Sequence, residues 1–219
     1  MRPLRHEMVM HPAEAVAALL DATGTLVTSV VPPGFEAYVR VLNPIDLGDG
    51  TTIAWTDLVR RSKVEPRAWM QWPELAAGGI ALPDGAAEPD MGSPPPTLAR
   101  HLVEALRPGR GKHHFASWGG YALEISGSTV PFSPDRREVV LYSGRLVDDA
   151  GDPLVPTTAT GRVPMYWWPE DLGWCVGHDI YARSLIVGCG AARARRILES
   201  PGLDAYRVDP TDFLPNEEF

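Results

Sequence analysis

The sequence predicts a single α+β domain, with helices packed on a mixed, mostly antiparallel, twisted sheet. Short strand-like runs separated by turn residues fill the second half of the chain, while runs with helical spacing dominate the first. No internal repeat and no sharp change in composition divides the 219 residues. Residues 1–219 are therefore predicted to fold as one unit with a sizeable core.

The first elements are predicted from their turn residues and their apolar spacing. Residues 12–23 predict a helix, because a proline opens the run and a glycine follows it. Residues 25–31 and 35–42 predict strands on either side of a Pro-Pro-Gly turn at 32–34. Apolar and polar residues alternate along 35–42, so this strand is expected to be half-buried.

Two further helices are predicted in the middle of the chain, at 52–62 and 97–107. Between them, residues 76–96 carry Gly-Gly, Pro-Asp-Gly and Pro-Pro-Pro, which leave no room for a regular element. A loop of this length is either a lid over a site or a surface excursion. The sequence favours the surface excursion without excluding the lid.

From His113 onward the pattern changes to short strands typical of an antiparallel meander. A helix is predicted at 191–200 and a second long loop at 148–162. Strands are predicted at 114–118, 121–125, 138–142, 163–167, 172–180, 184–187 and near 203–208.

Charge and cysteine content limit the classes of partner. The formal net charge of −8 repels phosphate backbones and anionic lipid, so neither a nucleic acid nor a membrane is predicted as a partner. No stretch approaches the roughly 20 apolar residues of a spanning helix. The two cysteines make no disulfide framework and the first residues lack export features, so a cytoplasmic location is predicted. No cofactor is predicted, because Gly188-Cys189-Gly190 lacks the third glycine of a dinucleotide-binding turn.

The densest stretch of the sequence is 166–180, and the rest of the chain is interpreted as built around it. It holds three of the seven tryptophans, one of the two cysteines and an acidic pair. Tryptophan and tyrosine combine a large apolar surface with a polar group, so such a cluster marks either a core centre or the floor of a pocket. Trp174 alternates with Leu172 and Val176 and is predicted to face the core with them.

Three motifs resemble a family of uncharacterised bacterial proteins of similar length. They are Val-Pro-Pro-Gly-Phe-Glu-Ala-Tyr at 31–38, Tyr-Trp-Trp-Pro-Glu-Asp at 166–171 followed by Trp-Cys-Val at 174–176, and Val-Gly at 187–188 before a helix. The resemblance extends over most of the chain and implies one architecture throughout. It implies no activity, substrate or catalytic residue.

The cysteines admit two chemical interpretations, as metal ligands and as a nucleophile. Cys175 and His178, with Cys189 further along, have a spacing seen in zinc sites. If 172–180 is a strand, however, Cys175 and His178 point to opposite faces, so no metal is predicted. Cys175 is either a nucleophile paired with a histidine or a small buried hydrophobe, and the aromatic surroundings favour the second.

The predicted function is a cytoplasmic binding or interaction protein with an aromatic-lined groove for a protein or a small molecule. The alternative is a hydrolase that uses a carboxylate pair, or a Cys/His pair, near the tryptophans. Against this alternative, the Pro-Glu-Asp run at 169–171 also fits a solvated turn between two strands. The residues predicted to bind a ligand are Trp118, Tyr121, Trp168, Glu170, Asp171, His178 and Asp179.

Overall fold

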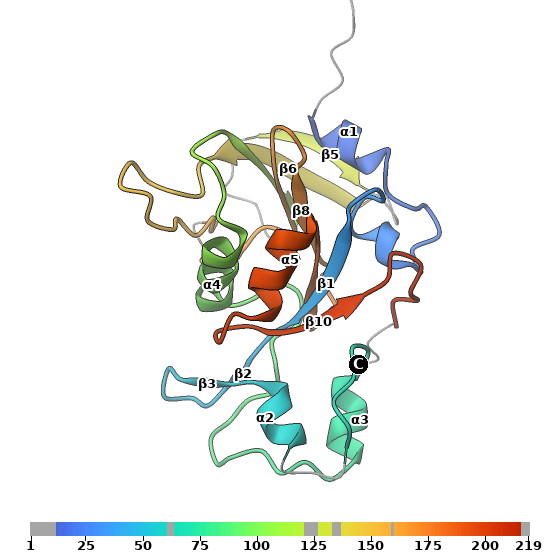
Figure 1. Ribbon diagram of the computed structural model, residues 1–219, viewed down its shortest axis with the longest axis vertical. Helices are drawn as coiled ribbons and strands as arrows, with labels where there is room; N and C mark the ends of the chain where they lie inside the picture. The colour runs from blue at the N-terminus through green and yellow to red at the C-terminus, as the bar shows by residue number, and fades with distance from the viewer. Residues whose placement is uncertain (1–11, 61–63, 121–126, 133–136, 159, 216–219) are drawn as a thin grey trace, which may run out of the picture.

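The computed structural model describes residues 12–60, 64–120, 127–132, 137–158 and 160–215 (Figure 1). Its centre is an eight-stranded sheet with the order β10-β1-β9-β8-β7-β4-β6-β5, in which all the pairings are antiparallel. The predicted α+β class is confirmed. The strands are β1 (Ala37–Leu42), β4 (His113–Trp118), β5 (Ser128–Phe132), β6 (Arg137–Gly144), β7 (Tyr166–Pro169), β8 (Trp174–Gly177), β9 (Ser184–Cys189) and β10 (Asp204–Val208).

Both faces of the sheet are covered. The helices α4 (Pro96–Leu106) and α5 (Ala191–Leu198) pack on one face and share a core with β1, β7, β8 and β9. The other face packs against α1 (Pro12–Ala17) and the short 3₁₀ helix η1 (Val27–Ser29). Alternate residues of each strand supply the two cores, as period-2 geometry requires.

Helix α4 is the longest helix in the described part of the chain and is fixed at both ends. It begins at a Pro-Pro pair and turns its leucines to the sheet through their helical spacing. It ends where Arg107 adopts a left-handed conformation, with φ of 48°. The guanidinium groups of Arg193 and Arg196 on α5 donate to the carbonyls of Leu106 and Ala105 at 3.1 and 2.9 Å. Positive charge at a helix C-terminus is stabilising, so α5 both caps and positions α4.

A small lobe adjoins one end of the sheet and has its own hydrophobic core. It consists of the hairpin β2 (Ile45–Asp46) and β3 (Thr52–Ile53) with α2 (Trp55–Val59) and α3 (Trp72–Ala77), drawn in cyan and green at the bottom of Figure 1. Its core is formed by Leu42, Ile45, Trp55, Leu58, Val59, Met70, Trp72 and Leu75.

Arg40 of β1 ties this lobe to the sheet. Its side chain is buried, with 1% of the residue surface exposed. Its Nε donates to Ser184 Oγ at 3.0 Å, and its Nη1 donates to the carbonyls of Ala68 and Met70 at 2.8 and 2.9 Å. The guanidinium also lies over the ring of Trp69, 5.2 Å from its centroid. The buried guanidinium of Arg40, on a central strand, thus provides hydrogen bonds to two backbone carbonyls of the lobe.

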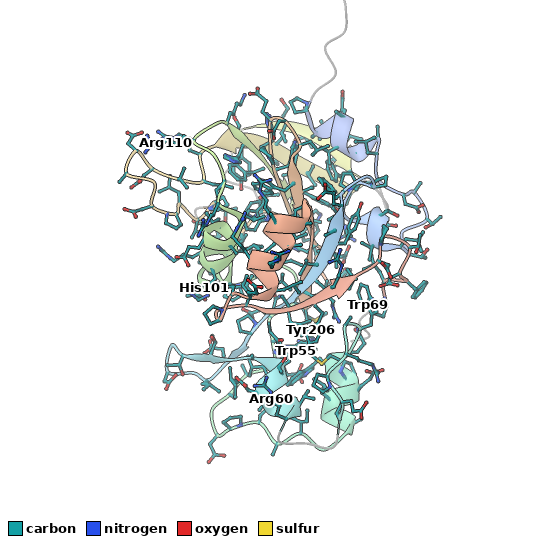
Figure 2. All side chains as sticks on the ribbon, in the orientation of Figure 1. Trp55, Arg60, Trp69, His101, Arg110 and Tyr206 are labelled. Atoms are coloured by element: carbon teal, nitrogen blue, oxygen red, sulfur yellow. The ribbon has the colours of Figure 1, made fainter. Side chains whose placement is uncertain are left out.

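Further polar contacts cross the same boundary. Trp55 Nε1 donates to the Asn43 carbonyl at 2.8 Å, and Thr56 Oγ1 lies 2.8 Å from the hydroxyl of Tyr206 on β10. Figure 2 shows Trp55, Trp69 and Tyr206 gathered between the lobe and the sheet. Sheet and lobe are therefore joined by specific hydrogen bonds in addition to packing.

The predicted strand at 25–31 is wrong, since this segment forms η1 and lies across a face of the sheet. Two glycines explain how it comes so close. A Cβ at Gly177 would lie 2.0 Å from the Val30 carbonyl oxygen, and one at Gly188 would lie 2.7 Å from Cγ1 of Val31. Because these glycines lack side chains, the segment packs directly on the face of the sheet. From that position it does not pair with a strand edge.

The strand predicted at 35–42 exists as β1, but it is not half-buried. All six residues of β1 are buried, because β1 lies between β9 and β10 and both faces of the sheet are covered. Its polar residues are satisfied internally: the Tyr38 hydroxyl donates to the Pro32 carbonyl at 3.0 Å. The alternation in its sequence reflects a buried polar network and not a solvated face.

Other boundaries differ more modestly. The helices expected at 12–23 and 52–62 are shorter, as α1 and α2, and residues 52–53 pair with β2. Strand β5 was not predicted, and the strand expected at 121–125 lies outside the described residues. Residues 78–95 form no helix or strand, in agreement with the first predicted loop. In the second, the described residues hold only an isolated bridge between Val147 and Pro153.

Candidate functional site

The Trp-rich stretch is a core centre. Trp167 and Trp174 lie in the core beneath α4 and α5, with their rings edge to face at 6.4 Å. Trp168 and Cys175 lie in the core on the opposite face, where Trp168 stacks with His114 at 5.7 Å. Trp174 is only 1% exposed, which confirms its predicted burial. These tryptophans fill the interior and present no floor to solvent.

Glu170 and Asp171 are exposed in the turn between β7 and β8. Asp171 Oδ1 accepts a hydrogen bond from the backbone N–H of Gly173 at 3.0 Å, and Leu172 between them has φ of 50°. This left-handed residue turns the Leu172 side chain to the core opposite Trp174, so the expected alignment of Leu172 with Trp174 and Val176 is wrong. The arrangement matches the solvated turn that the sequence offered as an alternative.

Two of the predicted ligand residues, Trp118 and Asp179, do come together, around Arg137. The guanidinium of Arg137 lies 5.9 Å from the Trp118 ring centroid and 5.7 Å from that of Tyr181. Arg137 also pairs with Asp179 at 3.4 Å. This surface cluster uses its aromatic rings to hold its own arginine. Tyr121 lies outside the described residues.

Neither thiol is prepared for nucleophilic attack. Both cysteines are free and buried. Burial raises the pKa of the Cys175 thiol far above its ordinary range, and burial raises the pKa of Cys189 to about 11. A thiol acts as a nucleophile in its thiolate form, which these environments disfavour.

His178 is buried, and its environment disfavours the charged form. Its Nδ1 lies 3.1 Å from the Asp179 carbonyl oxygen, to which it donates when protonated there. Nε2 is buried and makes no hydrogen bond within the described part of the chain. Desolvation is the main cause that lowers the pKa of His178 below its ordinary 6.5.

This burial makes stability depend on pH. In the unfolded chain His178 takes up a proton as the pH falls below about 6.5, whereas burial holds its pKa lower in the folded chain. The contribution of neutral His178 to the free energy of unfolding is therefore fully present above pH 6.5 and is lost as the pH falls towards the folded-state pKa. The slope contributed by one histidine is at most about 1.4 kcal/mol per pH unit. Urea melts between about pH 7.5 and 5.5 are expected to show a shallower loss for His178→Leu than for the wild type. Equal slopes would contradict this assignment.

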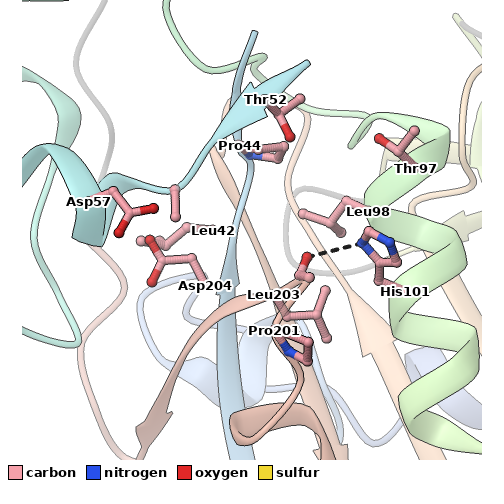
Figure 3. A pocket seen from close by; sticks show the side chains of 12 residues that line it. Leu42, Pro44, Thr52, Asp57, Thr97, Leu98, His101, Pro201, Leu203 and Asp204 are labelled. Atoms are coloured by element: carbon pink, nitrogen blue, oxygen red, sulfur yellow. Dashed lines mark hydrogen bonds between the residues drawn. The ribbon is translucent and has the colours of Figure 1, made fainter. Parts of the chain in front are cut away.

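A pocket of about 200 Å³ opens between the small lobe, the N-terminal half of α4 and the start of β10 (Figure 3). None of its lining residues is a tryptophan or a tyrosine, so it is not the predicted aromatic groove. Its lining consists of Leu42, Pro44, Thr52, Ala54, Asp57, Thr97, Leu98, His101, Pro201, Gly202, Leu203 and Asp204.

Two carboxylates stand on the lobe side of this pocket. Asp204 Oδ2 accepts from the backbone N–H of Thr56 at 2.9 Å, and its Oδ1 accepts from the Thr56 hydroxyl at 2.5 Å. Asp204 thereby supplies the N-terminal cap that Ala54, the residue before α2, cannot provide. Asp57 of α2 pairs with Arg60, three residues further along the chain, at 3.3 Å.

The opposite wall is formed by α4 and the 201–203 turn. His101 Nδ1 lies 3.1 Å from the Gly202 carbonyl oxygen, a contact drawn in Figure 3. A Cβ at Gly202 would lie 2.4 Å from that imidazole, so a side chain there would displace the ring. The wall therefore depends on a glycine at this position.

The sequence did not reveal this pocket, because its polar residues come from separate segments. Asp57 and His101 lie on two helices with ordinary amphipathic patterns, and Asp204 begins a short strand. Only Asp204, placed just after a Pro-Gly turn and before a strand, had any unusual local setting. Tertiary structure alone assembles the pocket.

No metal centre is formed within the described ranges, where no three His, Cys, Asp or Glu side chains are grouped to hold an ion. None of the helices in this part of the chain combines the length and apolar character needed to cross a membrane. Comparison with protein-family models, curated proteins and solved structures gives no match. The resemblance to an uncharacterised bacterial family therefore stays a prediction.

Proposed function

We propose that this chain is a binding protein whose ligand, a small molecule, occupies the pocket between the small lobe and the sheet. The observation that supports it is the pocket itself, which lies where two separate hydrophobic cores meet and is lined by a few convergent polar groups. Ligand sites in proteins favour such boundaries. The two buried free thiols fit a reducing compartment, so the proposal places the protein in the cytoplasm.

Binding is favoured over catalysis because the groups nominated for chemistry do not converge on this pocket. Glu170 and Asp171 lie exposed in a turn, and Cys175 is buried in the core. The pocket lining contains no cysteine or serine, and its two carboxylates are already engaged, Asp57 by Arg60 and Asp204 by Thr56. A hydrolase remains the alternative prediction from the sequence.

The proposal is tested by closing the pocket. Thr97 is exposed on α4 and lines the pocket, so Thr97→Trp is expected to occupy the space without entering either core. Ala192→Trp is the matched control, since it adds the same ring to an exposed position of α5 outside the pocket. Each protein is incubated with a small-molecule extract of bacterial cells, and the retained compounds are identified by mass spectrometry.

At least one compound is expected to be retained by the wild type and by Ala192→Trp but lost by Thr97→Trp. The proposal fails if the three proteins retain the same compounds. Thermal melts of each variant establish that the folds are equally intact.

A further inference from the structure

We infer that the ligand of this pocket is a small organic cation that carries a primary amine; this inference rests on the proposed function. Asp57 and Asp204 both line the pocket, and Figure 3 draws both side chains on its lobe side. No lysine or arginine is among the lining residues. The pocket thus offers two acidic groups and no basic counterpart except the imidazole of His101.

The carboxylate of Asp204 accepts its hydrogen bonds from neutral groups at the start of α2. One oxygen accepts from the backbone N–H of Thr56 and the other accepts from the Thr56 hydroxyl, and both donors are uncharged. Within the described residues no cationic side chain forms an ion pair with it. A carboxylate of this kind retains acceptor capacity, since each oxygen has two lone pairs. An ammonium group is a matching partner, because it is a compact charge with three donors.

Asp57 already pairs with Arg60, but this ion pair competes only weakly with a bound cation. The side chain of Arg60 is 71% exposed and that of Asp57 is 49% exposed. Exposed pairs of this type contribute little to stability. An ammonium group inside the pocket can therefore replace Arg60 as the partner of Asp57 at small cost.

The rest of the lining argues for an organic ligand and against a bare metal ion. Six of the lining residues are apolar, among them Leu42, Leu98 and Leu203, and would contact methylene groups. The hydroxyls of Thr52 and Thr97 offer neutral hydrogen bonds. A volume of about 200 Å³ is below the roughly 300–1,000 Å³ of pockets for drug-sized molecules, so the ligand has few heavy atoms.

The inference is tested with three four-carbon probes that differ in charge: 1,4-diaminobutane, 1,4-butanediol and succinate. Binding is measured by calorimetry at about 150 mM salt, which screens the general attraction of an acidic protein for cations. The diamine is expected to bind, and the diol and succinate are not. Asp57→Asn and Asp204→Asn are each expected to weaken the diamine about tenfold, as the loss of a charged hydrogen bond does.

The control is Asp84→Asn, which removes the same charge from an exposed position outside the pocket and is expected to leave the diamine affinity unchanged. In Asp204→Asn the remaining amide oxygen can still accept from the Thr56 N–H, while the amide nitrogen faces the Thr56 hydroxyl as a donor, and thermal melts check that α2 stays folded.

The possible results separate this inference from the proposed function. If the diol or succinate binds and Thr97→Trp abolishes that binding, the inference of an amine ligand is wrong, whereas the proposal that the pocket binds a ligand stands. Absence of diamine binding, or binding unaffected by both pocket aspartates, would overturn the inference, and the extract experiment then decides the proposed function independently. Calcium binding that depends on both aspartates, without diamine binding, would replace the amine by a metal ion.

Discussion

Replacement of Trp174 by alanine is expected to lower the free energy of unfolding by about 3–5 kcal/mol. Trp174 is 1% exposed and packs against rings from β4 and β7, with His113 at 5.7 Å and Trp167 at 6.4 Å between ring centroids. Removal of the indole leaves a cavity beneath α4 and α5 that rigid neighbouring strands cannot close. Urea melts monitored by circular dichroism measure the loss.

The matched control lies four residues away. Glu170 is exposed in the turn that precedes β8, so Glu170→Ala is expected to remain within roughly 0.5 kcal/mol of the wild type. A Trp174→Ala protein as stable as Glu170→Ala would show that β8 does not face the core as described.

Replacement of Arg40 by methionine is the second large effect, also expected at about 3–5 kcal/mol. Methionine is an unbranched, adaptable side chain that fills much of the same volume. It cannot donate to Ser184 or to the carbonyls of Ala68 and Met70, which would be left buried without their donor. Each unsatisfied buried group costs roughly 1–3 kcal/mol. Urea melts and limited proteolysis of the 64–77 segment measure the result.

Arg67→Met is the control for Arg40→Met. Arg67 lies on the lobe surface and pairs with Glu74, with both side chains about half exposed. It is expected to change stability by less than about 1 kcal/mol. Equal effects of the two substitutions would contradict the role of Arg40 in fastening the lobe.

The sequence predicted those helices and strands whose tertiary contacts agree with their local apolar spacing. Helix α4 was predicted from its leucine spacing and its flanking prolines, and both features act within the helix itself. The strand predicted at 172–180 from alternation exists as the shorter β8, at 174–177, whose residues enter the two cores in turn. The solvated turn before it follows from a Pro-Glu-Asp run whose aspartate caps its own turn.

The errors arise where distant contacts override a local pattern. The β-branched residues at 25–31 suit a strand, yet Gly177 and Gly188 let this segment lie flat on the sheet. The alternation in β1 indicated a solvated face, but Arg40 is held by the lobe. Likewise, the pocket depends on Asp57, Asp204 and the turn at Gly202 meeting in space, which no local spacing encodes.

The position of β1 between β9 and β10 has a consequence for folding. Tyr38 pairs with Gly188 on one side and with Val208 on the other, so the middle of this half of the sheet joins residues that are far apart in the chain. Contacts of such high sequence separation slow folding, because long loops must close before any pairing energy is gained. During synthesis β1 leaves the ribosome long before β9 and β10, so its apolar residues stay exposed until those strands are made. Chaperone association with the nascent chain would be concentrated in that interval.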